Sequence, residues 1–278
     1  MTDSKPTESA SAVLDLGAAV PSHKQVAAFF LLPACDIRCS FCISHNEFDV
    51  ARPADAEGLM EALAQTSIDS VVLGGGEPTL WPHDLNALAA SARRLGITTQ
   101  LNTHGGGVLA KLDDYSEIDR FILPLESSDP AVHDNLRRGF DGHHKMVLEL
   151  IDALVSAGRE LTFATVVTSE NHADIPKLAA WIGALCARGA RVHAWHLYNF
   201  LPEGRGGARE IAAHLATTRE QYLAACAAAK GAGLDFAVYR RDNMLKSSSV
   251  EFFWFEKGAL HMGGGDLTGR ALQGDQNW

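Results

Sequence analysis

The stretch Cys35-Asp36-Ile37-Arg38-Cys39-Ser40-Phe41-Cys42 follows an apolar run, Val26 to Leu32, that predicts a β-strand. Three cysteines so close together can point three thiolates at one centre, and thiolates are the usual ligands of iron–sulfur clusters and also bind zinc. A 4Fe–4S cluster held by three cysteines keeps one iron without a protein ligand. That iron can bind a small molecule.

Other uses of these cysteines must be weighed. A disulfide framework needs an even cysteine count in a secreted chain, whereas this chain has five cysteines and no signal-peptide pattern from Met1 to Pro21. A structural zinc site is the more serious alternative, because His45 follows Cys42 by three residues and would complete a Cys3His set. Unligated core thiols are disfavoured, because polar residues are interleaved with these cysteines.

Composition bounds the class of protein. The chain has 278 residues, 46% of them apolar, which suits one large α/β domain or two small ones. A formal net charge of −10 argues against a general nucleic-acid binder, and no apolar run approaches the length of a membrane span. We therefore expect no nucleic-acid partner and no membrane partner. Reduced, clustered cysteines predict a cytoplasmic location.

Short apolar runs alternate with amphipathic helical segments along the chain. The predicted strands are Val26–Leu32, Ser70–Leu73, Thr98–Leu101, Phe121–Leu125, Leu161–Val167 and Val192–Leu197. Continuous apolar runs suit strands covered on both faces, and such β/α units predict a parallel sheet with right-handed crossovers. A barrel and an open doubly wound sheet both fit this periodicity. In either, the site lies at the carboxyl ends of the strands.

We divide the chain into three parts. These are a flexible N-terminal tail at 1–22 with a short docking segment at Ala10 to Leu16, a β/α part at 23–233 and a C-terminal extension at 234–278 that caps it. Within the extension, Leu234–Tyr239 predicts one more strand. Val250–Phe255 predicts a hairpin with Ala259–Met262.

A second motif, Gly74-Gly75-Gly76-Glu77-Pro78, ends the second predicted strand. A plain turn or a phosphate cradle is the alternative, but the Lys and Ser or Thr of a Walker loop are absent. C-x3-C-x2-C with Phe41 before the third cysteine, followed by this Gly-Gly-Glu-Pro, resembles the signature of the radical S-adenosylmethionine (radical SAM) superfamily. The resemblance covers about residues 26–205.

The resemblance implies a fold, cofactors and an activity. The fold is an α/β, partial (β/α)6 TIM-like barrel with a short C-terminal extension. Cys35, Cys39 and Cys42 would ligate one 4Fe–4S cluster, with S-adenosylmethionine (SAM) at the open iron. The reduced cluster cleaves SAM to a 5′-deoxyadenosyl radical, which takes hydrogen from a substrate. The implied reductant is a flavodoxin- or ferredoxin-type electron donor.

The resemblance also assigns residues to SAM. Gly75, Gly76 and Glu77 would hold its amino group, since glycine permits close approach of the backbone. The other predicted cofactor-binding residues, in superfamily order, are Phe41, Asn102, Glu126, Ser127, Arg137, Val166, Phe200 and Leu201. Arg137 suits the SAM carboxylate through its fork of donors, and a solvated helix charge is the alternative.

The substrate is predicted only as a class. Within the superfamily the chain resembles small, single-cluster members such as viperin and the molybdenum-cofactor biosynthesis cyclase branch. Phe163-Ala164-Thr165 lacks the Lys and Asn with which viperin helps bind its nucleoside triphosphate. Cys186 and Cys226 fall on apolar helix faces, predict core packing, and are too few for the auxiliary clusters of many peptide-modifying relatives.

We therefore predict an enzyme acting on a small anionic metabolite, such as a nucleotide or a natural-product intermediate. Peptide modification and a non-catalytic iron–sulfur module are the alternatives. Arg240, Arg241 and Lys246 would face the anion if the extension covers the barrel mouth, with a solvated surface as the alternative. The histidines His133, His143 and His144 are predicted to lie on the surface or at helix caps.

Overall fold

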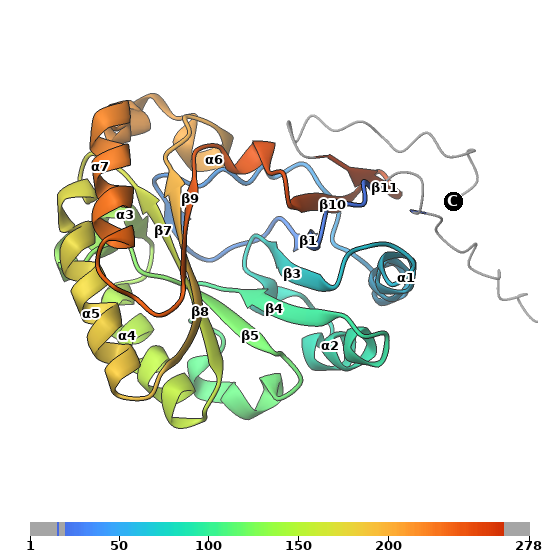
Figure 1. Ribbon diagram of the computed structural model, residues 1–278. Coiled ribbons are helices and arrows are strands. Elements are labelled where there is room, and N and C mark those ends of the chain that lie inside the picture. The colour runs from blue at the N-terminus through green and yellow to red at the C-terminus, as the bar shows by residue number, and fades with distance from the viewer. Residues whose placement is uncertain (1–15, 17–19, 264–278) are drawn as a thin grey trace, which may run out of the picture.

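The computed structural model describes Leu16 and residues 20–263. One sheet organises this part of the chain, in the order β11-β10-β1-β3-β4-β5-β7-β8-β9. Its strands are β1 (Val26–Leu32), β3 (Ser70–Gly75), β4 (Thr98–Asn102), β5 (Arg120–Pro124), β7 (Glu160–Val167), β8 (Arg191–Asn199), β9 (Ala237–Arg241), β10 (Val250–Glu256) and β11 (Ala259–Met262). Every neighbouring pair is parallel except β10 with β11. The sheet curls around a central space (Figure 1), so the prediction of a partial TIM-like barrel is confirmed.

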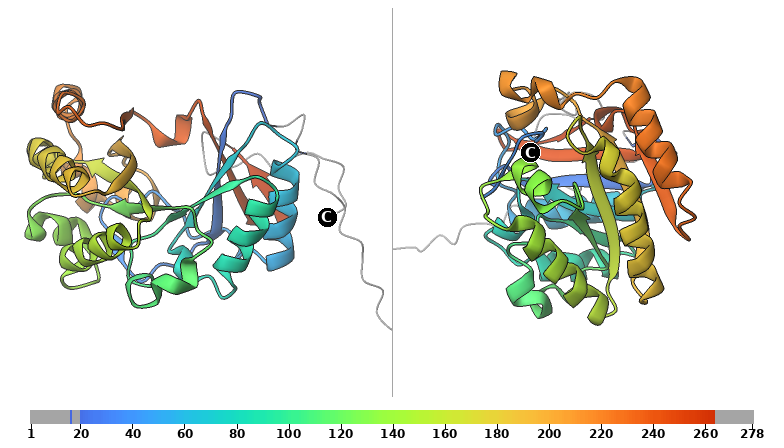
Figure 2. Two further views of the ribbon diagram at one scale, coloured as in Figure 1. Left: turned by 60° about the horizontal axis from the view of Figure 1, so that its bottom comes forward. Right: turned by 90° about the vertical axis from the view of Figure 1, so that its left-hand side faces the viewer.

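Helices cover the outside of the curled sheet (Figures 1 and 2). The helices of the described chain are α1 (Pro53–Leu63), α2 (Leu85–Arg94), α3 (Pro130–Leu136), α4 (His143–Ser156), α5 (Ile175–Ala187), α6 (Gly204–Gly207) and α7 (Arg219–Lys230), with short 3-10 turns η1 (Pro78–Leu80), η2 (Leu109–Tyr115), η3 (His172–Asp174), η4 (Glu210–Leu215) and η5 (Met244–Lys246). Their starts are encoded locally. Asp129 caps α3 through the amide of Ala131, and Thr218 forms a capping box with Gln221 at the start of α7.

The strands separate two environments because successive side chains point to opposite faces. In β1, Ala27, Phe29 and Leu31 are fully buried in the main core between sheet and helices. Ala28 and Phe30 point the other way and line a cavity inside the barrel. This explains why the strand reads as a continuous apolar run rather than an alternating one.

The C-terminal strands join opposite edges of the barrel sheet. β9 pairs with β8, whereas β10 pairs with β1, at the other end of the strand order. Residues 242–249, which include η5, therefore cross from one edge to the other, and they do so over the open side in Figure 1. The sheet therefore has more parallel strands than the six predicted β/α units supply, because β9 and β10 extend it at its two edges.

The predicted C-terminal hairpin is confirmed. β10 and β11 pair antiparallel from Phe253 opposite Met262 to Glu256 opposite Ala259. Lys257 and Gly258 form the two-residue turn with φ of 53° and 76°. Positive φ at both central positions is typical of the turn whose twist matches paired strands.

Part of the predicted N-terminal tail lies outside the described residues. Of the docking segment predicted at Ala10 to Leu16, only Leu16 is described, and it is buried in the main core. Within residues 20–263, none of the helices has the length and apolarity needed to cross a membrane. The boundaries at residues 22 and 233 stay predictions.

Candidate functional site

The cysteine loop lies at the carboxyl end of β1, where sequence reasoning places the site. Cys35, Cys39 and Cys42 are half-buried, and all three line the cavity inside the barrel. A two-residue ladder holds the loop, in which β2 (Arg38–Cys39) pairs with β6 (Arg137–Arg138). The ladder ties the middle cysteine to the end of α3.

The three sulfurs are spaced more widely than the ligands of a single zinc ion. A tetrahedral zinc, with Zn–S bonds of about 2.3 Å, holds its sulfurs about 3.8 Å apart. The sulfurs of Cys35, Cys39 and Cys42 do not all lie within 4.8 Å of one another. His45, the fourth ligand of the zinc alternative, is exposed and belongs to no group of clustered ligand atoms in the described chain.

Two arginines donate to the cysteine sulfurs. Arg137 Nη1 lies 3.6 Å from Cys39 Sγ, and Arg205 Nε lies 3.2 Å from Cys42 Sγ. Burial raises the pKa of Cys39 to about 12, and Arg137 opposes that shift. A thiol must lose its proton to bind metal, so cations at these sulfurs favour the ligating form.

Arg205 was missed by sequence reasoning. It lies in α6, which packs on the cysteine loop so tightly that a Cβ on Gly206 would stand 2.4 Å from the Cys39 carbonyl oxygen. Such a distance excludes any side chain at this position. The run Gly204-Arg205-Gly206-Gly207 just after a strand end was the available signal, because one charged residue among glycines indicates close approach of the backbone.

The Gly-Gly-Glu loop is joined to the segment between β1 and the first cysteine. The amide of Gly76 donates to the Leu32 carbonyl at 2.7 Å, and that of Glu77 to the Ala34 carbonyl at 2.8 Å. Gly75 has a φ of +109°, and a Cβ on Gly76 would lie 1.9 Å from the Ala34 oxygen. The loop can therefore approach the cysteine loop only because both positions are glycine.

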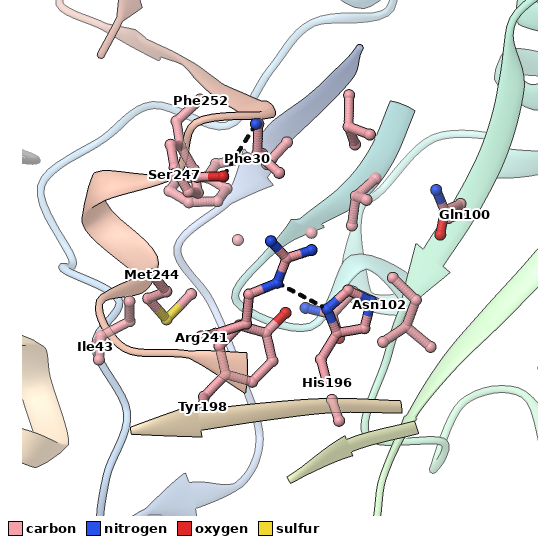
Figure 3. Close-up of a pocket in the computed structure, with 18 of the residues that line it drawn as sticks. Phe30, Ile43, Gln100, Asn102, His196, Tyr198, Arg241, Met244, Ser247 and Phe252 are labelled. Atoms are coloured by element: carbon pink, nitrogen blue, oxygen red, sulfur yellow. Dashed lines mark hydrogen bonds between the residues drawn. The ribbon is translucent and has the colours of Figure 1, made fainter. Parts of the chain in front are cut away.

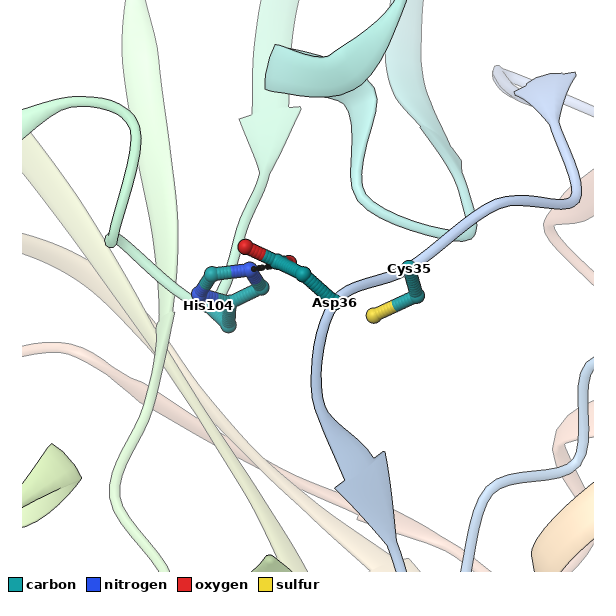
Figure 4. Close-up of side chains that lie close together, drawn as sticks. All are labelled: Cys35, Asp36 and His104. Carbon is teal, nitrogen blue, oxygen red and sulfur yellow. Dashed lines mark hydrogen bonds and ion pairs between the residues drawn. The ribbon is translucent and has the colours of Figure 1, made fainter. Parts of the chain in front are cut away.

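The Glu77 carboxylate is buried and organises its surroundings. It accepts hydrogen bonds from Thr79, from the Thr103 hydroxyl at 2.6 Å and from the His104 amide at 2.8 Å. The His104 ring also lies against Asp36, with Nε2 at 2.7 Å from Oδ1 (Figure 4). His104 thus links the Gly-Gly-Glu loop to the cysteine loop, a role that sequence reasoning did not identify.

Glu126 and Arg137, both predicted to contact SAM, bind each other. Arg137 donates to Glu126 Oε1 from Nε at 2.8 Å and from Nη2 at 2.7 Å, and Glu126 Oε2 accepts from the Val166 amide at 2.8 Å. Burial raises the pKa of Glu126, and Arg137 opposes that shift. Arg137 also lies over the Phe41 ring at 5.3 Å.

The prediction that His133, His143 and His144 lie on the surface or at helix caps is wrong, because all three are buried. His133 Nε2 and His143 Nδ1 are 2.8 Å apart, and His143 Nε2 lies 3.0 Å from the His104 carbonyl oxygen. Burial lowers the pKa of His133 to about 2 and of His143 to about 3, so both rings are neutral. Their side chains pack α3 and α4 against the loop after β4.

The cavity inside the barrel has a volume of about 1360 Å³. The predicted site residues that line it are Cys35, Cys39, Phe41, Cys42, Gly75, Gly76, Glu77, Asn102, Arg137 and Val166. Glu126, Ser127, Phe200 and Leu201 are not among its lining residues. Ser127 instead donates to Asp174 at 2.7 Å, and Phe200 packs in a small core beside Phe41.

A basic and aromatic wall closes the cavity at β8 and β9 (Figure 3). Arg241 Nε lies 3.1 Å from His196 Nδ1, and its guanidinium lies over the Tyr239 ring at 4.9 Å. His196 stacks between Tyr239 and Tyr198, with ring centroids 5.1 and 5.9 Å away. Burial and Arg241 lower the pKa of His196 to about 3, so the neutral ring accepts a hydrogen bond from Arg241 Nε.

The basic cluster expected from sequence lines this same cavity. Arg240, Arg241 and Lys246 are all lining residues, together with the crossing segment 242–249. Arg240 pairs with Asp242 at 2.8 Å, whereas Arg241 makes no ion pair within the described residues. Lys246 makes no ion pair there either, so Arg241 and Lys246 are the unpaired cations that a ligand in the cavity could meet.

Comparison with protein families matches residues 30–182, more than half of the chain, to the radical SAM superfamily model. The chain belongs to the radical SAM superfamily. The enzymes of this superfamily use a 4Fe–4S cluster and SAM, so the predicted cofactors are confirmed at the level of the family.

Relatives in the radical SAM superfamily have diverse functions. The chain is 27% identical to the pre-heme d1 synthase of Dinoroseobacter shibae, over 72% of this chain and 50% of that protein. It is also 27% identical to the S-adenosylmethionine-dependent nucleotide dehydratase of Flammeovirga pacifica, over 51% and 53%. The chain therefore spans about half the length of these curated relatives.

A solved radical SAM structure shares the fold. Streptococcus suis SuiB bound to S-adenosylmethionine superposes with a TM-score of 0.65 and 14% identity, over 90% of this chain and 63% of that one. At this identity the likeness concerns the fold alone.

Proposed function

We propose that this radical SAM enzyme acts on a small anionic metabolite, and that Cys35, Cys39 and Cys42 hold its one 4Fe–4S cluster. The observation that supports this is a single cavity onto which the cysteine loop, the Gly-Gly-Glu loop and Arg241 all face. When bound, the reduced cluster and SAM supply a 5′-deoxyadenosyl radical that takes hydrogen from an unactivated carbon.

The residues around the cysteines would prepare the cluster site. Arg137 and Arg205 place cationic donors at two of the three sulfurs, and charge-assisted hydrogen bonds of this kind stabilise thiolates and tune a bound metal. Glu126 holds Arg137 in position through two hydrogen bonds. In this proposal Glu126 therefore supports the cluster rather than touching SAM.

SAM would bind at the part of the cavity wall next to the cysteine loop. Gly75, Gly76 and Glu77, whose carboxylate is buried, all line the cavity there. A positively charged amino group would add one more charge-assisted bond to that carboxylate. Asn102 and Val166 line the same cavity and would flank the rest of the molecule.

The charges that line the cavity support an anionic substrate. Its described cationic residues are Arg120, Arg137, Arg205, Arg240, Arg241 and Lys246, whereas its acids are Asp69, Glu77 and Asp242. This local excess of cations stands within a chain of net charge −10. Because Arg137 and Arg205 are occupied by cysteine sulfurs, we assign the substrate anion to Arg241, with Arg240 and Lys246 nearby.

The crossing segment 242–249 would keep water from the reaction. It spans the gap between the two edges of the barrel and lines the cavity, with Met244 pointing inward beside Ile43 (Figure 3). Phe30 and Phe252 form an apolar wall under it, with ring centroids 5.9 Å apart. Exclusion of water protects a reactive intermediate from side reactions.

The test of the proposed function is anaerobic reconstitution with iron and sulfide. We expect roughly four irons and four sulfides per chain. After reduction, the protein should convert SAM to 5′-deoxyadenosine. Roughly eight irons per chain, or zinc without sulfide, would contradict the single cluster. An intact cluster that never cleaves SAM would favour a non-catalytic iron–sulfur module.

Glu77→Gln should weaken SAM binding while the cluster stays in place. Loss of one charge-assisted hydrogen bond costs about 1.5–3 kcal/mol, which lowers affinity about tenfold or more. Thr103→Val is the matched control, because it removes one donor to Glu77 and keeps the carboxylate charge. SAM titration of the reconstituted proteins gives the affinities, and an unchanged affinity for Glu77→Gln would make the loop purely structural.

Arg241→Ala should impair the use of substrate more than the basal cleavage of SAM. Loss of its contact with an anion should raise the apparent substrate KM about tenfold or more. Arg240→Ala should have a smaller effect, because Arg240 is already paired with Asp242. The measurement compares 5′-deoxyadenosine formation with and without the most effective compound from a panel of nucleotides and carboxylated metabolites. Equal effects of the two variants would remove Arg241 from the substrate site.

A further inference from the structure

The cysteine loop is a wall between two cavities. Its odd-numbered residues, including Ile37 and Cys39, line the cavity inside the barrel. The even-numbered residues Asp36, Arg38 and Ser40 line a second cavity of about 530 Å³, which shares no lining residue with the first. This alternation follows from the extended backbone around β2, whose side chains point to opposite faces.

The wall is thin at Cys39. Gly206 lines the second cavity, and a Cβ placed on it would stand 2.4 Å from the Cys39 carbonyl oxygen and 2.6 Å from the Cys42 amide nitrogen. The glycine therefore brings the second cavity to the backbone of the two cysteines with no side chain between. A molecule bound at the second cavity would lie directly behind these ligands.

Three arginines surround this second cavity, and we call Arg38, Arg138 and Arg209 the outer arginine face. All three are exposed, and none takes part in an ion pair within residues 20–263. Arg38 and Arg138 are direct partners in the β2–β6 ladder. Like charges opposite each other in a ladder are unfavourable, and a bound anionic surface would offset that cost.

The neighbouring acids leave this face basic. Asp36 lines the cavity, but its carboxylate is bound to His104 at 2.7 Å. His214 also lines the cavity and pairs with Glu170 at 3.0 Å. Within residues 20–263 this cavity thus has three arginines without an ion pair against one lining carboxylate, that of Asp36, in a chain whose net charge is −10.

An exposed apolar side chain lies among these charges. Ile211 lines the second cavity and is 61% exposed, the largest fraction for any large apolar residue in the described chain. Arginine is enriched at protein–protein interfaces, and here three arginines and an exposed apolar side chain line one cavity. This combination favours a protein partner over a free anion.

We propose that the outer arginine face docks an acidic one-electron carrier protein, a flavodoxin or ferredoxin, which reduces the cluster through the cysteine-loop wall. This rests on the proposed function, because it presupposes a cluster at Cys35, Cys39 and Cys42. One electron leaves the carrier's reduced flavin or iron–sulfur centre, so the carrier is oxidised by one electron and the cluster is reduced by one. No bond forms or breaks. Electron transfer slows steeply with distance, so a partner behind Cys39 and Cys42 is well placed, and substrate can occupy the other cavity at the same time.

The test reverses the three charges in the reconstituted protein. In Arg38→Glu/Arg138→Glu/Arg209→Glu, 5′-deoxyadenosine formation driven by limiting reduced flavodoxin should fall at least about tenfold, because complementary charges govern the encounter. Reduced methyl viologen, a small cation, should drive the same variant at the wild-type rate. The matched control, Arg94→Glu/Arg191→Glu/Arg219→Glu, has the same change in net charge on other exposed arginines and should keep its flavodoxin-driven rate.

A binding measurement keeps the test independent of turnover. Calorimetric titration of the cluster-loaded protein with oxidised flavodoxin should show binding that weakens with added salt and is lost in the charge-reversed variant. Lysine at the same three positions should retain binding, which separates loss of charge from misfolding. Equal flavodoxin affinity in the charge-reversed and control variants would overturn the docking face. So would preferential occupation of this face by nucleic acid or by a second copy of the chain.

The outcomes also separate the two proposals. Wild-type protein that makes no 5′-deoxyadenosine even with methyl viologen would refute the proposed function. Salt-sensitive flavodoxin binding at the outer arginine face would still support the docking inference. The protein could also be active with methyl viologen while its flavodoxin-driven rate is unchanged by reversing the three arginine charges. That result would refute only the docking inference.

Discussion

Cys39→Ala is expected to abolish the formation of 5′-deoxyadenosine from SAM. Cys39 is the central cysteine of the loop, held by the β2–β6 ladder with Arg137 at its sulfur. A cluster with three protein ligands loses one of them in this variant, and alanine supplies no replacement. The backbone hydrogen bonds of the loop do not use the sulfur, so the barrel should stay folded.

The measurement is made under anaerobic, reducing conditions. Iron and sulfide content and 5′-deoxyadenosine are compared between wild type, Cys39→Ala and the control Cys226→Ala. Cys226 is buried in the main core of the barrel on α7, so its loss should lower stability modestly and leave the cofactors in place. A Cys39→Ala protein that yields as much 5′-deoxyadenosine as wild type would refute Cys39 as a ligand.

Glu126→Ala is expected to lower the free energy of unfolding by about 3–5 kcal/mol, the usual cost of removing one partner of a buried ion pair. Glu126 is fully buried and accepts two hydrogen bonds from Arg137 and one from the Val166 amide. Within the described chain, the other partners of the Arg137 side chain are the Cys39 sulfur and the Phe41 ring, and neither is a second carboxylate. Alanine would leave the guanidinium buried without its counter-charge.

Urea unfolding of the metal-free proteins measures this effect. Glu149→Ala is the control, because the Lys145–Glu149 pair on α4 is exposed and should be worth less than about 1 kcal/mol. The double variant Glu126→Ala/Arg137→Met should recover much of the loss, since it removes the orphaned charge as well. A Glu126→Ala protein as stable as Glu149→Ala would show that Arg137 finds another partner or reaches solvent.

The Glu126–Arg137 ion pair also bears on the predicted SAM contacts. Sequence order placed Glu126, Ser127 and Arg137 near SAM, since polar residues at strand ends often contact a ligand. In the structure Glu126 accepts hydrogen bonds from Arg137, and Ser127 donates one to Asp174. Neither Glu126 nor Ser127 lines the cavity. SAM binding by the predicted residues therefore stays a prediction, which SAM titration of the Glu77→Gln variant tests.

The sequence by itself determined the family, the cofactors and the main β/α pattern. The reason is that these features are local. The three cysteines lie in one loop, the Gly-Gly-Glu turn ends one strand, and the runs from Val26 to Leu197 pair with sequential neighbours in the sheet. Asp129 and Thr218 also marked their helix starts, because a cap bonds to amides two or three residues away.

Only the tertiary structure decided the surroundings of the cluster site. Arg205 meets Cys42 across 163 residues of sequence, and Arg137 meets Cys39 across 98. In sequence, His133 and His143 look like ordinary polar residues. In the structure both rings are buried and form a hydrogen bond with each other. No local pattern encodes such partners, because the pairing exists only once the strands have brought their carboxyl ends to one edge.

In the C-terminal extension, too, the sequence predicted the strands but not their partners in the sheet. Its apolar runs predicted β9 and the β10–β11 hairpin, but not that β9 would join β8 and β10 would join β1. Parallel pairing carries no turn signal between the partners, so the choice of edge depends on which strands remain uncovered after the other β/α units have assembled. That choice places residues 242–249 across the cavity and brings Arg241 to face its interior.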